Sequence, residues 1–282
     1  MLLKLMKHEM KSLWHYCGLV IICVLIASAI FEIGVVGVVA IKNSVVDIIM
    51  IPSLIFLGFA IVAVLAYGIQ FGVAFRFYRT MSSDEGYLTH TLPVNTSQHI
   101  LSKLLSACIY TICSVIYLII FIVLTVIVLA GVTGGFDHFP DIMRELKVAY
   151  DEFKSVVNIP IALFIAEYTI MSLVSVVYSI LIMYVSVALG QLISTHKFVW
   201  SVVFYMIITS VIGIITQIAT MIFTAIPGLF APFMAAGENA TPELFMGATH
   251  VIILIVTVLM AVVGLVAFFV TKYIYERKLN LE

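Results

Sequence analysis

Six long apolar runs, separated by polar stretches, constrain this chain more than any other feature. A transmembrane helix needs roughly 20 predominantly apolar residues, and each run is long enough to supply one. Soluble domains are about 45–50% apolar and about 25% charged, whereas this chain is 63% hydrophobic and 10% charged. We therefore expect residues 1–282 to form a single transmembrane domain, an all-α integral membrane protein. Its six transmembrane helices are predicted at about residues 16–40, 48–75, 103–131, 159–194, 198–226 and 248–271.

The basic residues predict how these spans are oriented, because cytoplasmic segments of membrane proteins carry the excess of Lys and Arg. With the N-terminus inside, ten of the 14 basic residues are cytoplasmic. The outer loops hold the other four, which are Lys42, Arg144, Lys147 and Lys154. We therefore expect a multi-pass protein of the cell membrane, with its N- and C-termini both cytoplasmic.

Residues 1–15 predict an N-terminal amphipathic helix that lies in the lipid headgroup layer. Apolar side chains follow one helical face, and Lys4, Lys7 and Lys11 follow another, which is typical of interfacial helices. A secretory signal is the alternative. Its basic region would be unusually long, and the apolar run continues to Ile41.

The two long outer loops predict different structures. In the loop 132–158, residues 137–157 place apolar side chains at helical intervals among acids and lysines, which predicts a helix lying on the outer membrane surface. In the loop 227–247, Pro and Gly interrupt the apolar stretch 227–234. Broken backbone within a membrane must be shielded from lipid, so this stretch is predicted to be a re-entrant segment.

A polar island, the cytoplasmic loop 76–102, separates the second and third apolar runs. Ser82 and Glu85 have the Ser-x-x-Glu spacing in which two side chains satisfy the free amides at a helix start. Pro93 lacks an amide donor and ends such a helix. We therefore predict a short cytoplasmic helix between spans two and three, with Asn95–Gln98 capping the span that follows.

This island resembles the coupling segment of type-2 ABC exporter permeases. The residues that carry the resemblance are Asp84-Glu85-Gly86-Tyr87-Leu88-Thr89, then Thr91-Leu92-Pro93-Val94, and then Ile100-Leu101-Ser102-Lys103. The chain departs from the family pattern in two places. Asn95-Thr96-Ser97 lacks the Arg that usually follows Pro-Val-Ser, and Ser102 stands where Gly is usual before Lys103.

The resemblance implies a permease subunit that pairs with a separate cytoplasmic ABC ATPase and works as a dimer with a second copy or a paralogue. It also implies a short coupling helix that touches the ATPase, and a re-entrant element before the last span. The expected ATPase-coupling residues are Ser82, Asp84, Glu85, Gly86, Tyr87, Leu88, Leu92 and Pro93. Glu85 is expected to cap the coupling helix and contact the ATPase, and Gly86 to allow close approach.

The chain itself carries no sign of catalysis or cofactor binding. It lacks the Gly-x-x-x-x-Gly-Lys-Ser/Thr phosphate loop, so we expect ATP and magnesium to bind the partner subunit. His90, His99 and His196 are too scattered in the sequence to predict a metal site. A net charge of -1 gives no indication of a nucleic-acid partner.

Polar residues inside the predicted spans are the candidates for a translocation pathway. Glu167 lies within span four, where a charge usually marks function, here a proton relay or a substrate contact. The simpler explanations are a position near the outer interface, a protonated carboxyl or a bond to a neighbouring helix. Glu32 is expected at the outer membrane boundary as a solvated carboxylate. Two polar stripes could line a path or could pack helices together. Their residues are Tyr168, Ser172, Ser175, Ser179 and Ser186 in span four, and Thr209, Gly213, Thr216, Gln217, Thr220 and Thr224 in span five.

Three functions compete at this stage. The first is an ATP-driven export permease whose substrate is hydrophobic or amphipathic, such as a peptide antibiotic, a lipid or a drug-like compound. The second is an ion-coupled secondary transporter that uses Glu167, against which stands the absence of internal repeats. The third is a membrane sensor or immunity protein that binds without transporting.

Overall fold

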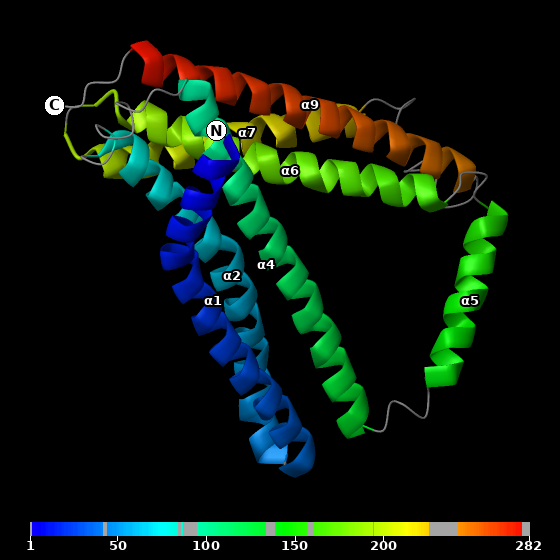
Figure 1. Cartoon of the computed structure of the whole chain (residues 1–282). Coiled ribbons are helices and arrows are strands. Elements are labelled where there is room, and N and C mark those ends of the chain that lie inside the picture. Colours follow the sequence, from blue (N-terminus) through cyan, green and yellow to red (C-terminus); the bar gives the residue numbers. More distant parts are fainter. Residues whose placement is uncertain are drawn as a thin grey trace. The chain divides into compact units, whose positions relative to one another are not determined.

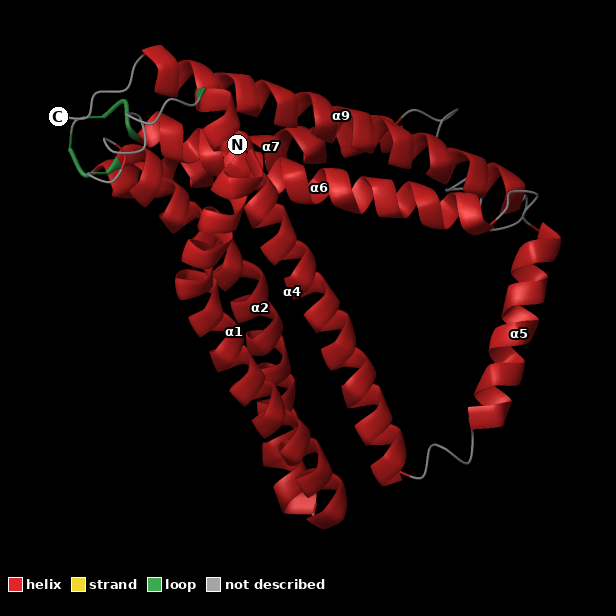
Figure 2. Cartoon of the chain, in the orientation of Figure 1, coloured by secondary structure: helices red, strands yellow, loops and turns green. Residues whose placement is uncertain are grey.

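The computed structural model is helical in every regular element that it describes (Figure 2). It describes residues 2–41, 44–83, 86, 95–133, 139–156, 161–193, 195–225 and 242–277. The helices, labelled in Figure 1 where there is room, are α1 (Leu2–Ile41), α2 (Ser44–Ser82), α4 (Thr96–Thr133), α5 (Phe139–Val156), α6 (Ile161–Gly190), α7 (Lys197–Ala225) and α9 (Pro242–Arg277).

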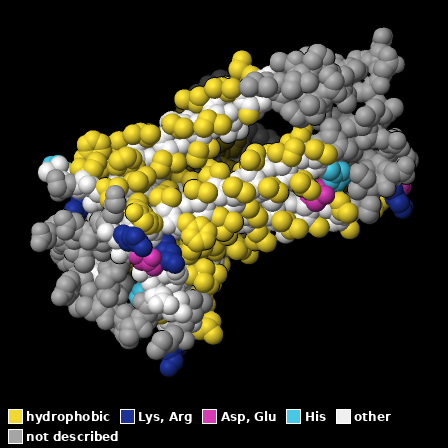
Figure 3. All heavy atoms as spheres, turned by 90° about the horizontal axis from the view of Figure 1, so that it is seen from above, with side chains coloured by type: hydrophobic (Ala, Val, Ile, Leu, Met, Phe, Trp, Pro, Cys, Tyr) yellow, Lys and Arg dark blue, Asp and Glu magenta, His cyan; other side chains and the backbone are white. Residues whose placement is uncertain are grey.

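Six of these helices are long and apolar enough to cross a membrane, which confirms a multi-pass, all-α membrane protein. Hydrophobic side chains cover most of the described surface in Figure 3, as expected where lipid replaces water as the solvent. The six candidate spans are Leu3–Val38, Ile49–Ser82, Thr96–Val132, Ala162–Gly190, Lys197–Ala219 and Thr249–Arg277. Which membrane they cross, and in which direction, stay predictions.

The N-terminal residues belong to the first long helix. α1 runs without a break from Leu2 to Ile41, so the structure joins the predicted helix 1–15 to the first span. It does not confirm a separate interfacial helix. The physical reason is that residues 2–15 lack Gly and Pro, and their backbone packs against α4 through the hydrogen bonds described below.

The segment that joins α2 to α4 is described only in part. Asn95 directly precedes α4, and its carbonyl accepts hydrogen bonds from the backbone N–H groups of Gln98 (2.8 Å) and His99 (3.2 Å). Asn95 therefore occupies the predicted N-cap position. Most of the predicted coupling helix lies outside the described residues, as does the predicted re-entrant segment 227–234.

α5 is a helix in the region where the sequence predicts one, residues 137–157. Ile142, Leu146 and Tyr150 recur at intervals of four residues along it and are exposed. Its location on the outer membrane surface stays a prediction.

The chain forms two compact units, Met1–Glu145 and Leu146–Glu282. In the first unit, α1 packs against both α2 and α4. Glycines on α2 permit this close packing: a Cβ at Gly68 would lie 2.9 Å from Val20, and one at Gly72 would lie 3.2 Å from Cys17. The Gly-x-x-x-Gly pair thus makes a contact within the subunit. In the second unit, α6 packs against both α7 and α9.

Candidate functional site

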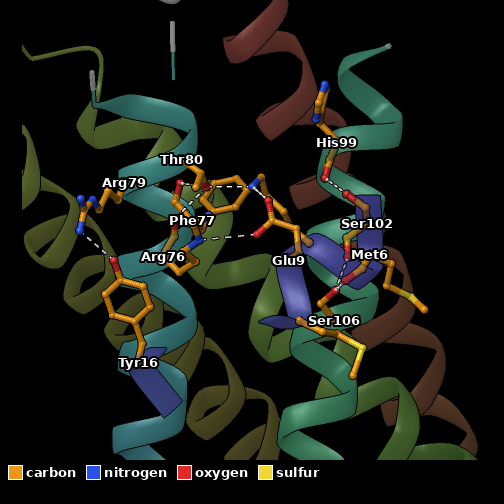
Figure 4. Close-up of polar contacts among 12 residues, drawn as sticks. Met6, Glu9, Tyr16, Arg76, Phe77, Arg79, Thr80, His99, Ser102 and Ser106 are labelled. Atoms are coloured by element: carbon orange, nitrogen blue, oxygen red, sulfur yellow. Dashed lines mark hydrogen bonds and ion pairs between the residues drawn. The ribbon is translucent and has the colours of Figure 1, made fainter. Parts of the chain in front are cut away.

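Charged side chains from three helices meet near the segment that joins α2 to α4 (Figure 4). The Lys103 ammonium of α4 donates a hydrogen bond to Glu9 of α1. Arg76 of α2 lies on the other side of the same carboxylate, with its Nε 3.7 Å from Glu9 Oε2. Lys103 Nζ also donates to the Thr80 hydroxyl of α2 at 2.8 Å. We call Glu9, Arg76, Thr80 and Lys103 the polar cluster.

The polar cluster is largely shielded from solvent. The exposed fraction of the side chain is 4% for Lys103, 12% for Glu9 and 17% for Arg76. Burying a charge is unfavourable unless it is paired and hydrogen-bonded, so each of these charges depends on the others. The cluster therefore favours one arrangement of α1, α2 and α4 at this end of the first unit.

Further hydrogen bonds extend this link along α1. They come from side chains of α2 and α4 and end on the first 16 residues of the chain. Two of them use backbone carbonyls of α1 as acceptors, so they fix the helix itself. The bonds join Arg79 Nη1 to the Tyr16 hydroxyl (2.9 Å), the Ser106 hydroxyl to the Met6 carbonyl (3.4 Å), and the Tyr110 hydroxyl to the Met10 carbonyl (3.0 Å).

The structure describes two of the predicted ATPase-coupling residues. Ser82 is the last residue of α2 and is buried. Its predicted capping role stays a prediction. Close to this helix end, the Thr80 hydroxyl donates to the Arg76 carbonyl at 2.7 Å. Gly86 is buried, and its N–H donates to the Ser83 carbonyl at 2.7 Å. The other predicted residues lie outside the described part of the chain: Asp84, Glu85, Tyr87, Leu88, Leu92 and Pro93.

Glu167 of α6 is bonded to a neighbouring helix. Its Oε2 contacts Nδ1 of His250 on α9, and the two side chains are 28% and 14% exposed. The ring of Phe164 meets His250 edge-on, with centroids 5.3 Å apart. Of the interpretations weighed for Glu167, the structure supports a helix-to-helix bond. The pair connects α6 to α9 inside the second unit.

The hydroxyl groups of the two polar stripes mostly bond to their own helices. Ser172, Ser179 and Ser186 donate to carbonyls of α6, and Thr209 and Thr216 donate to carbonyls of α7. Such bonds satisfy a hydroxyl proton without a second helix. Of the remaining stripe residues, Ser175 is half-buried, and Tyr168, Gly213 and Gln217 are exposed. The side chains of Thr220 and Thr224 lie outside the described part of the chain. Both readings of the stripes stay open.

Glu32 of α1 differs from its predicted solvated state. The Thr125 hydroxyl of α4 bonds to Glu32 Oε1 at 2.7 Å. Glu32 Oε2 is buried, and no side chain or backbone group in the described part of the chain donates a hydrogen bond to it. The expectation was wrong because helix rise alone gives the depth of a residue in the membrane and says nothing of the helix that packs beside it.

Sequence reasoning did not identify five residues of these sites: Glu9, Arg76, Thr80, Thr125 and His250. Glu9 is a lone acid among Lys4, Lys7 and Lys11, which is the one signal that its charge has a special partner. Thr125 and His250 carry no signal, because isolated polar residues in apolar runs do not reveal which helix they face.

Comparison with known proteins assigns this chain to no family. No family model, no curated protein and no solved structure matches it.

Proposed function

We propose that this chain is the permease subunit of an ATP-driven exporter of the type-2 ABC class. A separate cytoplasmic ATPase binds ATP and magnesium, and the permease works as a dimer with a second copy or a paralogue. The loop 76–102 receives the movement of the ATPase. The chain itself provides the membrane path.

The polar cluster is the observation that supports this proposal. The loop joins α2 to α4, and the cluster lies in the helices that flank it, with Thr80 near the end of α2 and Lys103 near the start of α4. Glu9 adds α1 to the same contact. A force on the loop therefore acts on three helices held together by buried charges, instead of bending the end of one.

This arrangement suits a mechanical mechanism. Closure of the ATPases pushes on the loop, and the α1–α2–α4 unit moves as one body between inward-open and outward-open states. The composition of the spans favours hydrophobic or amphipathic cargo, because few charged side chains are available inside the membrane to bind a sugar or an ion.

Photo-crosslinking tests this function directly. A photoreactive residue placed at Leu88 in the full-length protein should capture an ATP-binding subunit in native membranes. The matched control is the same residue at Leu146 on α5, which should capture none. Leu88→Asp should weaken association with the ATPase roughly tenfold, since charge at the centre of an interface is strongly unfavourable. Capture of no ATP-binding protein at Leu88, or equal capture at both positions, contradicts the proposal.

A functional assay then tests the coupling itself. In the reconstituted complex, Glu85→Ala and Leu88→Asp should leave ATP hydrolysis in place while transport is lost. Asp141→Ala on α5 should change neither. Unchanged coupling in the Glu85 and Leu88 variants argues against the assignment.

The second candidate, an ion-coupled transporter, is favoured by the Glu167–His250 pair, since paired ionisable residues within spans often carry protons. It predicts pH-driven transport in liposomes that contain no ATPase, and loss of that transport in Glu167→Gln. Transport that needs the ATPase and survives Glu167→Gln rejects it.

A further inference from the structure

The first turns of α1 carry a row of basic side chains on one exposed face. These residues recur at intervals of three or four along the helix, which places them above one another on the same side. All of them are exposed, and the three lysines among them form no ion pair with any described residue. We call this row the basic stripe, and its members are Lys4, Lys7, His8, Lys11 and His15.

The one acid in this part of the helix is turned away from the basic stripe. Glu9 lies on the packed side of α1, where its carboxylate pairs with Lys103 of α4 and Arg76 of α2. The other helices therefore already neutralise it, and residues 2–15 offer the stripe no second acid. Helix faces that are merely solvated commonly carry charges of both signs. The separation of charge across α1 is the feature that points to an anionic partner.

The length of α1 places the basic stripe at the level of the lipid head groups. At 1.5 Å per residue, residues 16–41 rise about 39 Å, which exceeds the roughly 30 Å hydrocarbon core. The lysines can thus stay outside the core, where a charge is expensive. Trp14 follows Lys11 by one helical turn and is 56% exposed. Its indole ring lies 3.3 Å from where a Cβ on Gly18 would be, so it leans toward the apolar part of the helix, as is typical of Trp at a membrane interface.

We propose that the basic stripe binds anionic phospholipid. The lysine ammonium groups donate hydrogen bonds to the phosphate oxygens, their apolar stems lie along the lipid, and Trp14 packs where the acyl chains begin. Zwitterionic lipids fit less well, because their own cation already neutralises the phosphate. The inference goes beyond the proposed function, since it needs neither ATP nor a partner subunit. The bound lipid holds the same end of α1 that supplies Glu9 to the polar cluster.

Quenching of Trp14 fluorescence by brominated lipids tests the proposal. The chain has two tryptophans, so Trp200→Phe leaves Trp14 as the single reporter in the full-length protein. Nanodiscs contain phosphatidylcholine and phosphatidylglycerol at a fixed ratio, with bromine on the acyl chains of one lipid or of the other. Phosphatidylglycerol should associate at Trp14 roughly fivefold more strongly than phosphatidylcholine, which is about the contribution of one lysine near an anionic surface.

Charge removal and charge retention separate the role of the lysines from that of the fold. Combined Lys4→Gln, Lys7→Gln and Lys11→Gln should make the two lipids associate equally, while quenching by brominated phosphatidylcholine stays the same and shows that Trp14 keeps its depth. The three corresponding Lys→Arg substitutions should retain the preference. The matched control removes two exposed lysines of α5, by Lys147→Gln with Lys154→Gln, and should also retain it.

Equal association of the two lipids in the Trp200→Phe protein overturns the proposal, as does a preference that survives the three Lys→Gln substitutions. A preference that sodium phosphate abolishes, but sodium chloride of the same ionic strength does not, assigns the stripe to soluble anions and also overturns it. A nanodisc exposes both membrane surfaces, so the result does not depend on the orientation of the chain. No ATPase is present, so a negative result leaves the test of the coupling loop unaffected.

Discussion

At the scale of single residues, Glu9 is the charged side chain on which the other charges of the polar cluster depend. It is the one carboxylate of the polar cluster and faces two basic groups, Lys103 and Arg76. Without its charge, two like charges from α2 and α4 would remain in a shielded site. Like charges that cannot be solvated repel strongly, so the acid is what allows the basic residues to be buried there.

Glu9→Gln is therefore expected to destabilise the protein by about 3 kcal/mol, the size typical of breaking a buried ion pair by removing one partner. The matched control is Glu276→Gln, which removes an exposed pair with Lys272 at the end of α9 and should change stability by less than about 1 kcal/mol. Chemical unfolding in detergent measures both. The double variant Glu9→Leu with Lys103→Met should recover part of the loss. Equal changes in stability in the two single Gln variants would show that the polar cluster does not stabilise the fold.

At the scale of helices, the backbones of α6 and α7 approach each other closely at one point of the second unit. α6 is buried from Ile180 to Ala188 and ends at Gly190, where α7 passes closely: a Cβ on Gly190 would lie 2.2 Å from the Ser201 hydroxyl and 2.7 Å from its backbone N. Gly213 on α7 is different, because a Cβ there would meet nothing within 4 Å. Gly190 is therefore needed for close packing of α6 against α7, whereas at Gly213 only helix propensity is at stake.

Gly190→Ala should destabilise the protein by about 1–3 kcal/mol, because the backbone of α7 must shift to admit the methyl group. Gly213→Ala should be neutral or stabilising by up to about 1 kcal/mol, since alanine is the better helix former and finds open space. Thermal unfolding of the two purified variants in the same detergent gives the comparison. A Gly190→Ala protein as stable as the wild type would show that α6 and α7 are not in contact at this point.

At the scale of the whole molecule, the sequence predicts the number and approximate positions of the six long apolar helices, because the length of an apolar run is a local property. It also predicts Asn95 as a cap, because capping depends only on neighbouring residues. The pairs Glu9–Lys103 and Glu167–His250 were not predictable, since their members are 94 and 83 residues apart. Only the packing of helices decides which polar residues meet. The extent of α1 was missed for the same reason.

The orientation of the six spans is a property of the whole molecule that decides the proposed function. Six crossings would place both termini on one side of the membrane and α5, which follows the third candidate span, on the other. After replacement of the four native cysteines by alanine, a cysteine at Glu276 should react with a membrane-impermeant maleimide only in permeabilised cells. A cysteine at Asp141, exposed on α5, should react in intact cells. The reverse pattern would put residues 84–94 outside the cell, where no cytoplasmic ATPase reaches them, and the exporter assignment would fail.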